Sequence, residues 1–123
     1  MRYVLVLFGG ALGALARYVV DGWVVSRLDT GFPFGTLVVN LSGSFLLGVL
    51  SVVTVERLLL PGEWRVLLGI GFLGAYTTFS TWQYETFRLL EAGQWGAGLV
   101  NLFGSAVAGF AALVLGVLVG RVL

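Results

Sequence analysis

The stretch that decides the fold is GFLGAYTTFSTWQYE, residues 71–85. All of it except Glu85 lies in an uncharged run, residues 66–84, that is long enough to cross a bilayer. The middle of this run, residues 77–81, is polar and aromatic where a lipid-facing helix carries leucines. Non-helical backbone at membrane depth is tolerated only around a protein-lined site. We therefore expect a membrane helix that is broken at mid-membrane beside an ion or ligand site. The alternative is an intact helix whose threonines bond back to carbonyls four residues earlier.

The composition is that of a membrane protein. Of the 123 residues, 59% are hydrophobic and 11% are charged, with a mean hydropathy of +1.01; soluble domains average about 25% charged residues. Cysteine and histidine are absent, which removes thiol chemistry, the usual zinc sites and the commonest general base. Because no paired carboxylates share one depth either, we do not expect an enzyme. A net charge of +1 offers no basic patch, so we expect no nucleic-acid partner.

Four apolar runs have about the 20 residues that a bilayer crossing needs. They cover about residues 3–25, 34–55, 66–84 and 96–120, and the segments between them hold both prolines and most of the charges. The prediction is a single all-α domain, residues 1–123, that is integral to the lipid bilayer and has four transmembrane helices.

The arginines are almost balanced across the membrane. With four spans, the N-terminus, second connector and C-terminus share one side, which holds four arginines, and the other side holds three. Arginine and lysine in short loops set orientation, so this small bias has two readings. Either another signal orients the chain, or it inserts both ways and forms an antiparallel homodimer.

Residues four apart share a helix face, and the second span carries a polar stripe with this spacing. It consists of Thr36, Asn40, Ser44 and Gly48. The Asn40 amide has donors and an acceptor that are costly to leave unpaired in hydrocarbon. It serves either as an interhelical hydrogen bond that packs the helices or as a donor aimed at a permeating anion.

Two other spans carry stripes whose meaning stays open. In the first span, Arg17 and Asp21 either bond to each other or leave Arg17 facing an aqueous vestibule that attracts anions. In the fourth span, Asn101 and Ser105 either line a polar path or bond to another helix. The same span has a ladder that predicts a packing seam, made of Gly104, Ala108, Ala112, Gly116 and Gly120.

The third span has the chemistry to bind a small anion. Its threonines and serine supply hydroxyl donors, and an opened helix supplies backbone amides for an anion or carbonyls for a cation. Phe79 adds a ring whose edge is positive. No carboxylate lies at this depth, since Glu85 falls at the end of the span, so a cation pathway built on carboxylates is disfavoured.

Three blocks of the chain resemble the CrcB/Fluc family of microbial fluoride channels. They are GGALGALARY at residues 9–18, GTLVVNLSGSFLLG at residues 35–48, and the stretch from Gly71 and Gly74 through TTFST to Glu85. Each glycine-rich block is weak alone. The blocks occur in the expected order and spans, and together they cover essentially the whole chain.

This resemblance implies a passive, fluoride-selective channel in the cell's inner or plasma membrane that sheds fluoride and assembles as an antiparallel homodimer. By position, Asn40 would donate to fluoride and Phe79 would present its ring edge. Arg17 would lie in a vestibule near a pore entrance. The backbone carbonyls of Gly74 and Thr77 would bind a structural sodium ion (Na+), shared with the other subunit. The further residues placed on the fluoride pathway are Thr36, Ser80, Thr81, Trp82 and Ser105.

The chain departs from the family pattern at two places. Trp82 stands where a second phenylalanine is common; its indole keeps a positive edge and adds an N–H donor. Ala75 and Tyr76 stand where glycine and an aromatic residue are more usual, and the methyl group of Ala75 reduces the freedom of the break.

Two other functions compete with the channel. A small multidrug-type antiporter has a similar length and number of spans, but proton-coupled export needs a titratable carboxylate in the membrane. Here the first span offers only Asp21, near its end. A non-transporting membrane assembly subunit would explain the glycine seams but not the polar centre of the third span.

Overall fold

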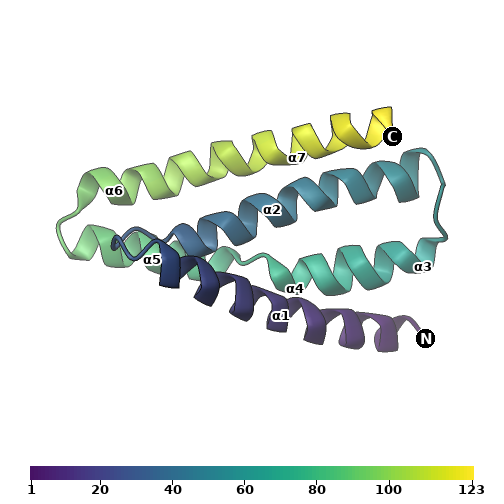
Figure 1. Ribbon diagram of the computed structural model, residues 1–123, viewed down its shortest axis with the longest axis horizontal. Helices are drawn as coiled ribbons and strands as arrows, with labels where there is room; N and C mark the ends of the chain where they lie inside the picture. Colours follow the sequence, from purple (N-terminus) through teal and green to yellow (C-terminus); the bar gives the residue numbers. More distant parts are fainter.

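The computed structural model describes residues 1–123, and all of its regular secondary structure is helical, as expected. It runs up and down as four adjacent rods (Figure 1). The rods are α1 (Arg2–Arg27); α2 (Phe34–Ser51) with η1 (Val52–Glu56); α3 (Gly62–Trp64) with η2 (Arg65–Leu73), α4 (Gly74–Tyr76) and α5 (Phe79–Glu91); and α6 (Trp95–Leu99) with η3 (Val100–Gly104) and α7 (Ser105–Val122). The three η segments are π-helical turns within longer helices.

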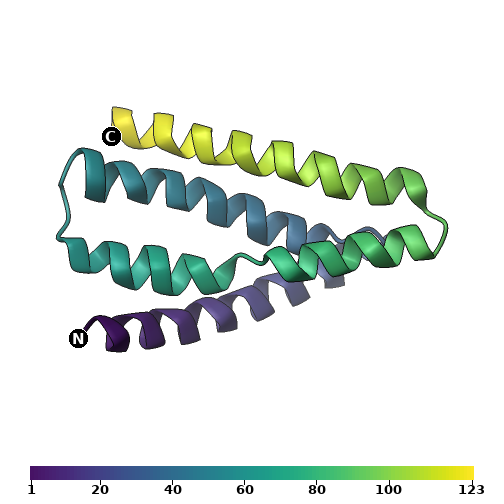
Figure 2. The same cartoon turned by 180° about the vertical axis from the view of Figure 1, so that it is seen from behind.

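Three of these rods are long and apolar enough to cross a membrane: Arg2–Arg27, Phe34–Glu56 and Trp95–Val122. The remaining rod is divided, because the chain leaves helical geometry between α4 and α5, as Figures 1 and 2 both show. Thr77 (φ −79°, ψ 157°) and Thr78 (φ −146°, ψ 120°) are extended. The residues that leave the helix are thus two of the five polar and aromatic residues at the centre of the third span.

The two chain termini and the connector between η1 and α3 lie at one end of the bundle (Figures 1 and 2). Side-chain interactions join the second and fourth rods at this end. Arg121 forms a two-pronged ion pair with Glu56, at 3.0 and 3.2 Å. Arg57 donates to the carbonyls of Gly120 and Leu123. Arg57 therefore connects the end of the second rod to the end of the chain.

Glycines let the rods approach until backbone meets backbone. On α7, Gly116 lies against the backbone of Phe45 on α2, and Gly120 lies against Val49 and Val52. Gly104, at the other end of the predicted ladder, is exposed. The packing seam predicted for the fourth span is therefore confirmed only for the half of the ladder that contains Gly116 and Gly120.

The interior of a single chain is small. Only 19 of the 123 residues are buried, so most apolar side chains face outward, as they do in a protein whose solvent is lipid. Three of the buried apolar residues, Val39, Leu73 and Tyr76, pack together as one cluster. These residues lie beside the end of α4, and they hold α2 against the helix break.

Candidate functional site

Asn40 and Thr78 form a reciprocal pair that holds the helix break open. The side-chain Nδ2 of Asn40 donates to the Thr78 carbonyl at 3.0 Å, and the Thr78 N–H donates to Asn40 Oδ1 at 2.8 Å. The amide of Asn40 thus pairs with both the N–H and the C=O of one residue, as a residue of a neighbouring antiparallel β-strand does. An amide nitrogen has two hydrogens, so one N–H of Asn40 remains for another acceptor. Of the two roles considered for Asn40, interhelical packing is therefore observed, and one donor is left for a ligand.

Thr78 also begins the next helix. Its hydroxyl accepts from the Thr81 N–H at 3.3 Å and so caps the N-terminus of α5. The first N–H groups of a helix have no acceptor within the helix, and the helix dipole makes this end partly positive. The break therefore leaves the amides of Phe79 and Ser80 without a helical acceptor, at a helix end that is suited to an anion.

The break also frees carbonyl oxygens. In a continuous helix the N–H of Thr78 would bond to Gly74 and that of Thr81 to Thr77; both instead donate to side chains. No backbone N–H outside the helices donates to the Gly74 or Thr77 carbonyl. Oxygen atoms of this kind are the ligands that hard cations prefer. The donor set thus fits the sodium ion expected at these two residues.

Arg17 caps a third freed carbonyl. Its Nε donates to the Ala75 oxygen at 3.1 Å, and Arg17 makes no ion pair with Asp21, whose carboxylate lies against Gly35 instead. Pairing between Arg17 and Asp21, one of the two readings above, is therefore wrong. The half-buried guanidinium lies at the helix break, where its positive charge adds to that of the α5 N-terminus.

A cavity of about 360 Å³ lies beside the break. It brings together four of the residues predicted on the fluoride pathway and one predicted at the metal site: Asn40, Phe79, Trp82, Ser105 and Thr77. The Phe79 and Trp82 rings meet edge to face, with centroids 5.4 Å apart and planes at 78°. Phe79 is 70% exposed. The cavity therefore opens on the surface of the chain, with an aromatic pair at its wall.

Trp82 differs from expectation in one respect. Its indole Nε1 donates to the backbone carbonyl of Asn101 at 2.8 Å. The N–H that the sequence suggested as an extra donor is therefore already bonded within the protein, and the ring offers only its C–H edges and faces to the cavity.

The other predicted pathway residues do not line this cavity. Thr36 is buried one turn before Asn40, and Ser80 is exposed. Thr81, whose N–H bonds to the capping hydroxyl of Thr78, is half-buried. Thr77 bonds back to the Leu73 carbonyl at 3.0 Å. That is the behaviour considered for an intact helix, and here it occurs at the last turn before the break.

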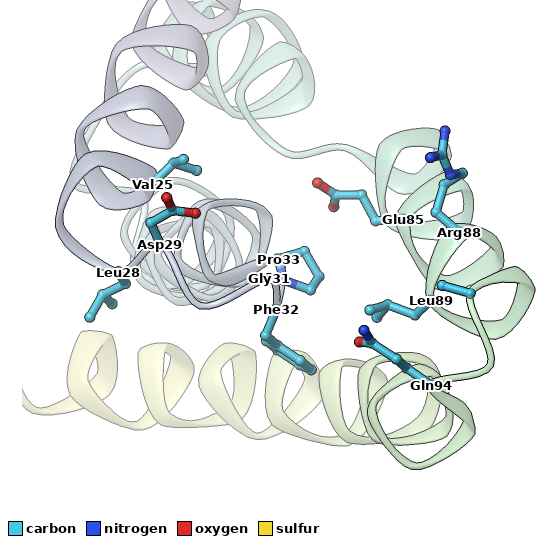
Figure 3. Close-up of a pocket in the computed structure, with 11 residues that line it drawn as sticks. Val25, Leu28, Asp29, Gly31, Phe32, Pro33, Glu85, Arg88, Leu89 and Gln94 are labelled. Atoms are coloured by element: carbon cyan, nitrogen blue, oxygen red, sulfur yellow. The ribbon is translucent and has the colours of Figure 1, made fainter.

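A second cavity, of about 380 Å³, lies at the end of the bundle where α1 leads into α2 (Figure 3). Glu85 projects from α5 toward the α1–α2 connector, and Arg88 projects away from it. One carboxylate oxygen of Glu85 is buried with no hydrogen-bonding partner. The hydrogen bond from Arg88 to the Tyr84 hydroxyl, with the nearby Glu91, raises the pKa of Arg88. Arginine is always charged in proteins, so Arg88 places a positive charge among the residues that line this cavity.

Sequence reasoning missed Thr78 and Thr86, which are the hydrogen-bonding partners of the Asn40 and Asn101 side-chain amides. The sequence pattern presents Thr78 only as one of several hydroxyl donors in the third span, yet its backbone is what Asn40 binds. Thr86 accepts from the Asn101 amide at 2.9 Å. A threonine one turn beyond the tryptophan was the only available signal for the second pair, and it is shared by many helices.

Comparison with known proteins places the chain in a family. Residues 4–117 match the family described as "CrcB-like protein, Camphor Resistance (CrcB)". A relative from Acidobacterium capsulatum, named fluoride-specific ion channel FluC, is 48% identical over 98% of this chain and 97% of its own length. Relatives with the same name from Geobacter metallireducens and Thermus thermophilus are 47% and 46% identical, over 98% and 99% of this chain and 98% and 95% of their own lengths. These matches cover all the rods and the helix break, and the chain therefore belongs to the CrcB-like family of multi-pass membrane proteins.

Proposed function

We propose that this chain forms a passive, fluoride-selective channel in the cell's inner or plasma membrane and lowers cytoplasmic fluoride. Its relatives are named fluoride-specific ion channels, and channels of this kind are not enzymes. The single observation that carries the proposal is the convergence of anion-binding groups on one cavity at the helix break.

Three kinds of group would replace the water around fluoride there. One is the remaining N–H of Asn40, whose orientation is fixed by its pair with Thr78. Another is the N-terminal turn of α5, whose first residue, Phe79, lines the cavity. The third is the edge of the Phe79 ring, which carries partial positive charge.

Selectivity follows from the spacing of these donors. Fluoride is small and strongly hydrated, so only closely set donors offset the loss of its water, and binding must stay weak enough for release. The larger chloride ion would be rejected by donors that approach too closely. Arg17, bonded to the Ala75 carbonyl beside the break, would raise the local concentration of anions.

A second copy in the opposite orientation would complete the pore. The wall of the cavity is open to the surface, and Phe79 is 70% exposed although it lies at the centre of the site. The nearly balanced arginines favour insertion both ways. Two inverted copies would then cover each other's cavities and shield the permeating ion from lipid.

Sodium would serve as a structural ion in this dimer. The carbonyls of Gly74 and Thr77 have lost their helical donors, which supports a cation site at mid-membrane depth. The same two carbonyls from each subunit would hold the ion and join the two broken helices. The ion would not be transported.

The test is fluoride efflux from liposomes that contain only this protein, with valinomycin to clamp the voltage and no pH gradient. We expect rapid release of fluoride without chloride, and loss of release in Asn40→Asp and Phe79→Ala. The matched control is Phe87→Ala, because Phe87 is an exposed phenylalanine two turns along the same helix and lines neither cavity described above.

Equal release of fluoride and chloride would overturn selectivity. Release that requires a proton gradient would favour the antiporter. No release from folded dimers would favour the assembly subunit, and Asn40 would then be an interhelical packing residue only.

A further inference from the structure

A closed ring of hydrogen bonds joins Trp82 to the fourth rod. The indole Nε1 of Trp82 donates to the Asn101 carbonyl at 2.8 Å. The Asn101 side-chain Nδ2 donates to the Thr86 hydroxyl at 2.9 Å, and that hydroxyl donates to the Trp82 carbonyl at 2.9 Å. Three bonds thus connect two residues of α5 with one residue of η3, and the ring begins and ends on Trp82.

This ring lies away from solvent. Asn101 is 2% exposed and Thr86 is 3% exposed, and Ser105 fills the remaining acceptor of Asn101 by donating to Oδ1 at 3.2 Å. Asn101 also lies in the π-helical segment Val100–Gly104. Such π-helical insertions inside α-helices occur frequently at functional sites. Breaking one bond here would leave a buried polar group without a partner, which favours one arrangement over all others.

The ring fixes which part of the indole reaches the cavity. The N–H edge is turned toward η3, and Trp82 still lines the cavity and meets Phe79 edge to face, with planes at 78°. Rotating the indole to offer its N–H to an anion would break the bond to Asn101. The backbone carbonyl of Asn101 thus holds the indole, and Thr86 holds Asn101 through its side-chain amide. Neither Asn101 nor Thr86 lines the cavity.

We propose that Thr86 and Asn101 are positioning residues for ion selectivity: they hold the Trp82 ring so that it presents C–H edges, and not its N–H, to the permeating anion. This rests on the proposed channel function. Thr86 is the residue to change, because valine has the shape of threonine but can neither accept from Asn101 nor donate to the Trp82 carbonyl.

The first measurement reads the ring orientation directly and needs no transport. The chain has four tryptophans, so ¹⁵N-tryptophan labelling gives four indole signals, and Trp82→Phe identifies the one from Trp82. We expect slow hydrogen exchange at that indole N–H in the wild type and faster exchange in Thr86→Val. Thr86→Ser keeps the hydroxyl and should behave as the wild type. Thr54→Val is the matched control, because Thr54 is equally buried and bonds only to the Leu50 carbonyl.

The second measurement is the ratio of fluoride to chloride release in liposomes. Interhelical hydrogen bonds in membranes are modest, so we expect Thr86→Val to lower this ratio about 3- to 20-fold. In the Trp82→Phe background, which has no N–H to orient, the same change should have a much smaller effect. Equal effects in both backgrounds would mean that Thr86 only packs the helices, and would overturn the proposal.

The two measurements distinguish failure of the channel function from failure of the proposed role of Thr86 and Asn101. If the wild type releases no fluoride, the channel function and the role in selectivity fail together, and the exchange measurement still decides whether Thr86 and Asn101 hold the Trp82 ring. If Thr86→Val does not fold, Thr86→Ala removes the same two bonds without added volume. A rapidly exchanging Trp82 indole in the wild type would overturn the proposal whichever variant folds.

Discussion

Replacing Gly43 with alanine tests how closely α2 must approach the helix break. A methyl group at this position would collide with Cγ2 of Thr77, and it would lie 3.1 Å from Cδ2 of Tyr76. The collision with Thr77 is about 1 Å inside the optimal carbon–carbon separation of about 3.5–4.0 Å. The Thr77 side chain cannot rotate away without losing the bond from its hydroxyl to Leu73. Either that bond is lost or the break moves.

The expected cost follows from this geometry. Overfilling a packed site costs about 1–3 kcal/mol, which lowers the ratio of folded to unfolded protein about 5- to 150-fold. Because Thr77 supplies a carbonyl to the proposed sodium site and lines the cavity, we expect fluoride release to fall as well. The assays are denaturant titration in detergent and fluoride efflux from liposomes.

A second substitution, Thr77→Ser, tests whether the contact between positions 43 and 77 causes this loss. Thr77→Ser removes the colliding Cγ2 and keeps the hydroxyl that bonds to Leu73. We expect Thr77→Ser alone to be nearly neutral and Gly43→Ala/Thr77→Ser to recover most of the lost stability and release. If the double variant is only as stable as the sum of the two single effects allows, Gly43 and Thr77 are not in contact and the reasoning is refuted.

Two further predictions concern the packing seam and the cap of α5. Gly116→Ala would place a methyl group against the Phe45 carbonyl group, 3.0 Å from its carbon, so it should destabilise the protein by about 1–3 kcal/mol in the same titration. Gly104→Ala has only the Val100 side chain nearby, at 3.6 Å, and should be neutral; equal effects would contradict the seam. Thr78→Ala should destabilise α5 by about 1 kcal/mol, measured as roughly fivefold faster amide exchange at Thr81, whereas Thr78→Ser should not.

Much of the fold could be predicted from the sequence because its causes are local. Long apolar runs, turn residues between them and a polar centre in one run depend on neighbours within a few residues. They predicted an all-helical membrane protein and a helix that opens within residues 77–81, where Thr77 and Thr78 are extended. The family resemblance rests on the same local blocks. It placed Asn40, Phe79, Trp82 and Ser105 on one pathway, and the structure brings all four to one cavity.

The partner that each polar group takes was decided by the tertiary structure. The amide of Asn40 could have bonded to any neighbouring helix, and it pairs with the backbone of Thr78, which is 38 residues away. Arg17 could have paired with Asp21 one turn along, yet it caps the Ala75 carbonyl, 58 residues away. Likewise, the ladder of small residues in the fourth span packs closely against the second rod only at Gly116 and Gly120. These hydrogen-bonding partners and packing contacts depend on which backbone groups the break leaves without a partner and on where the helices pack against each other. Those are properties of the packed bundle that no local pattern in the sequence encodes.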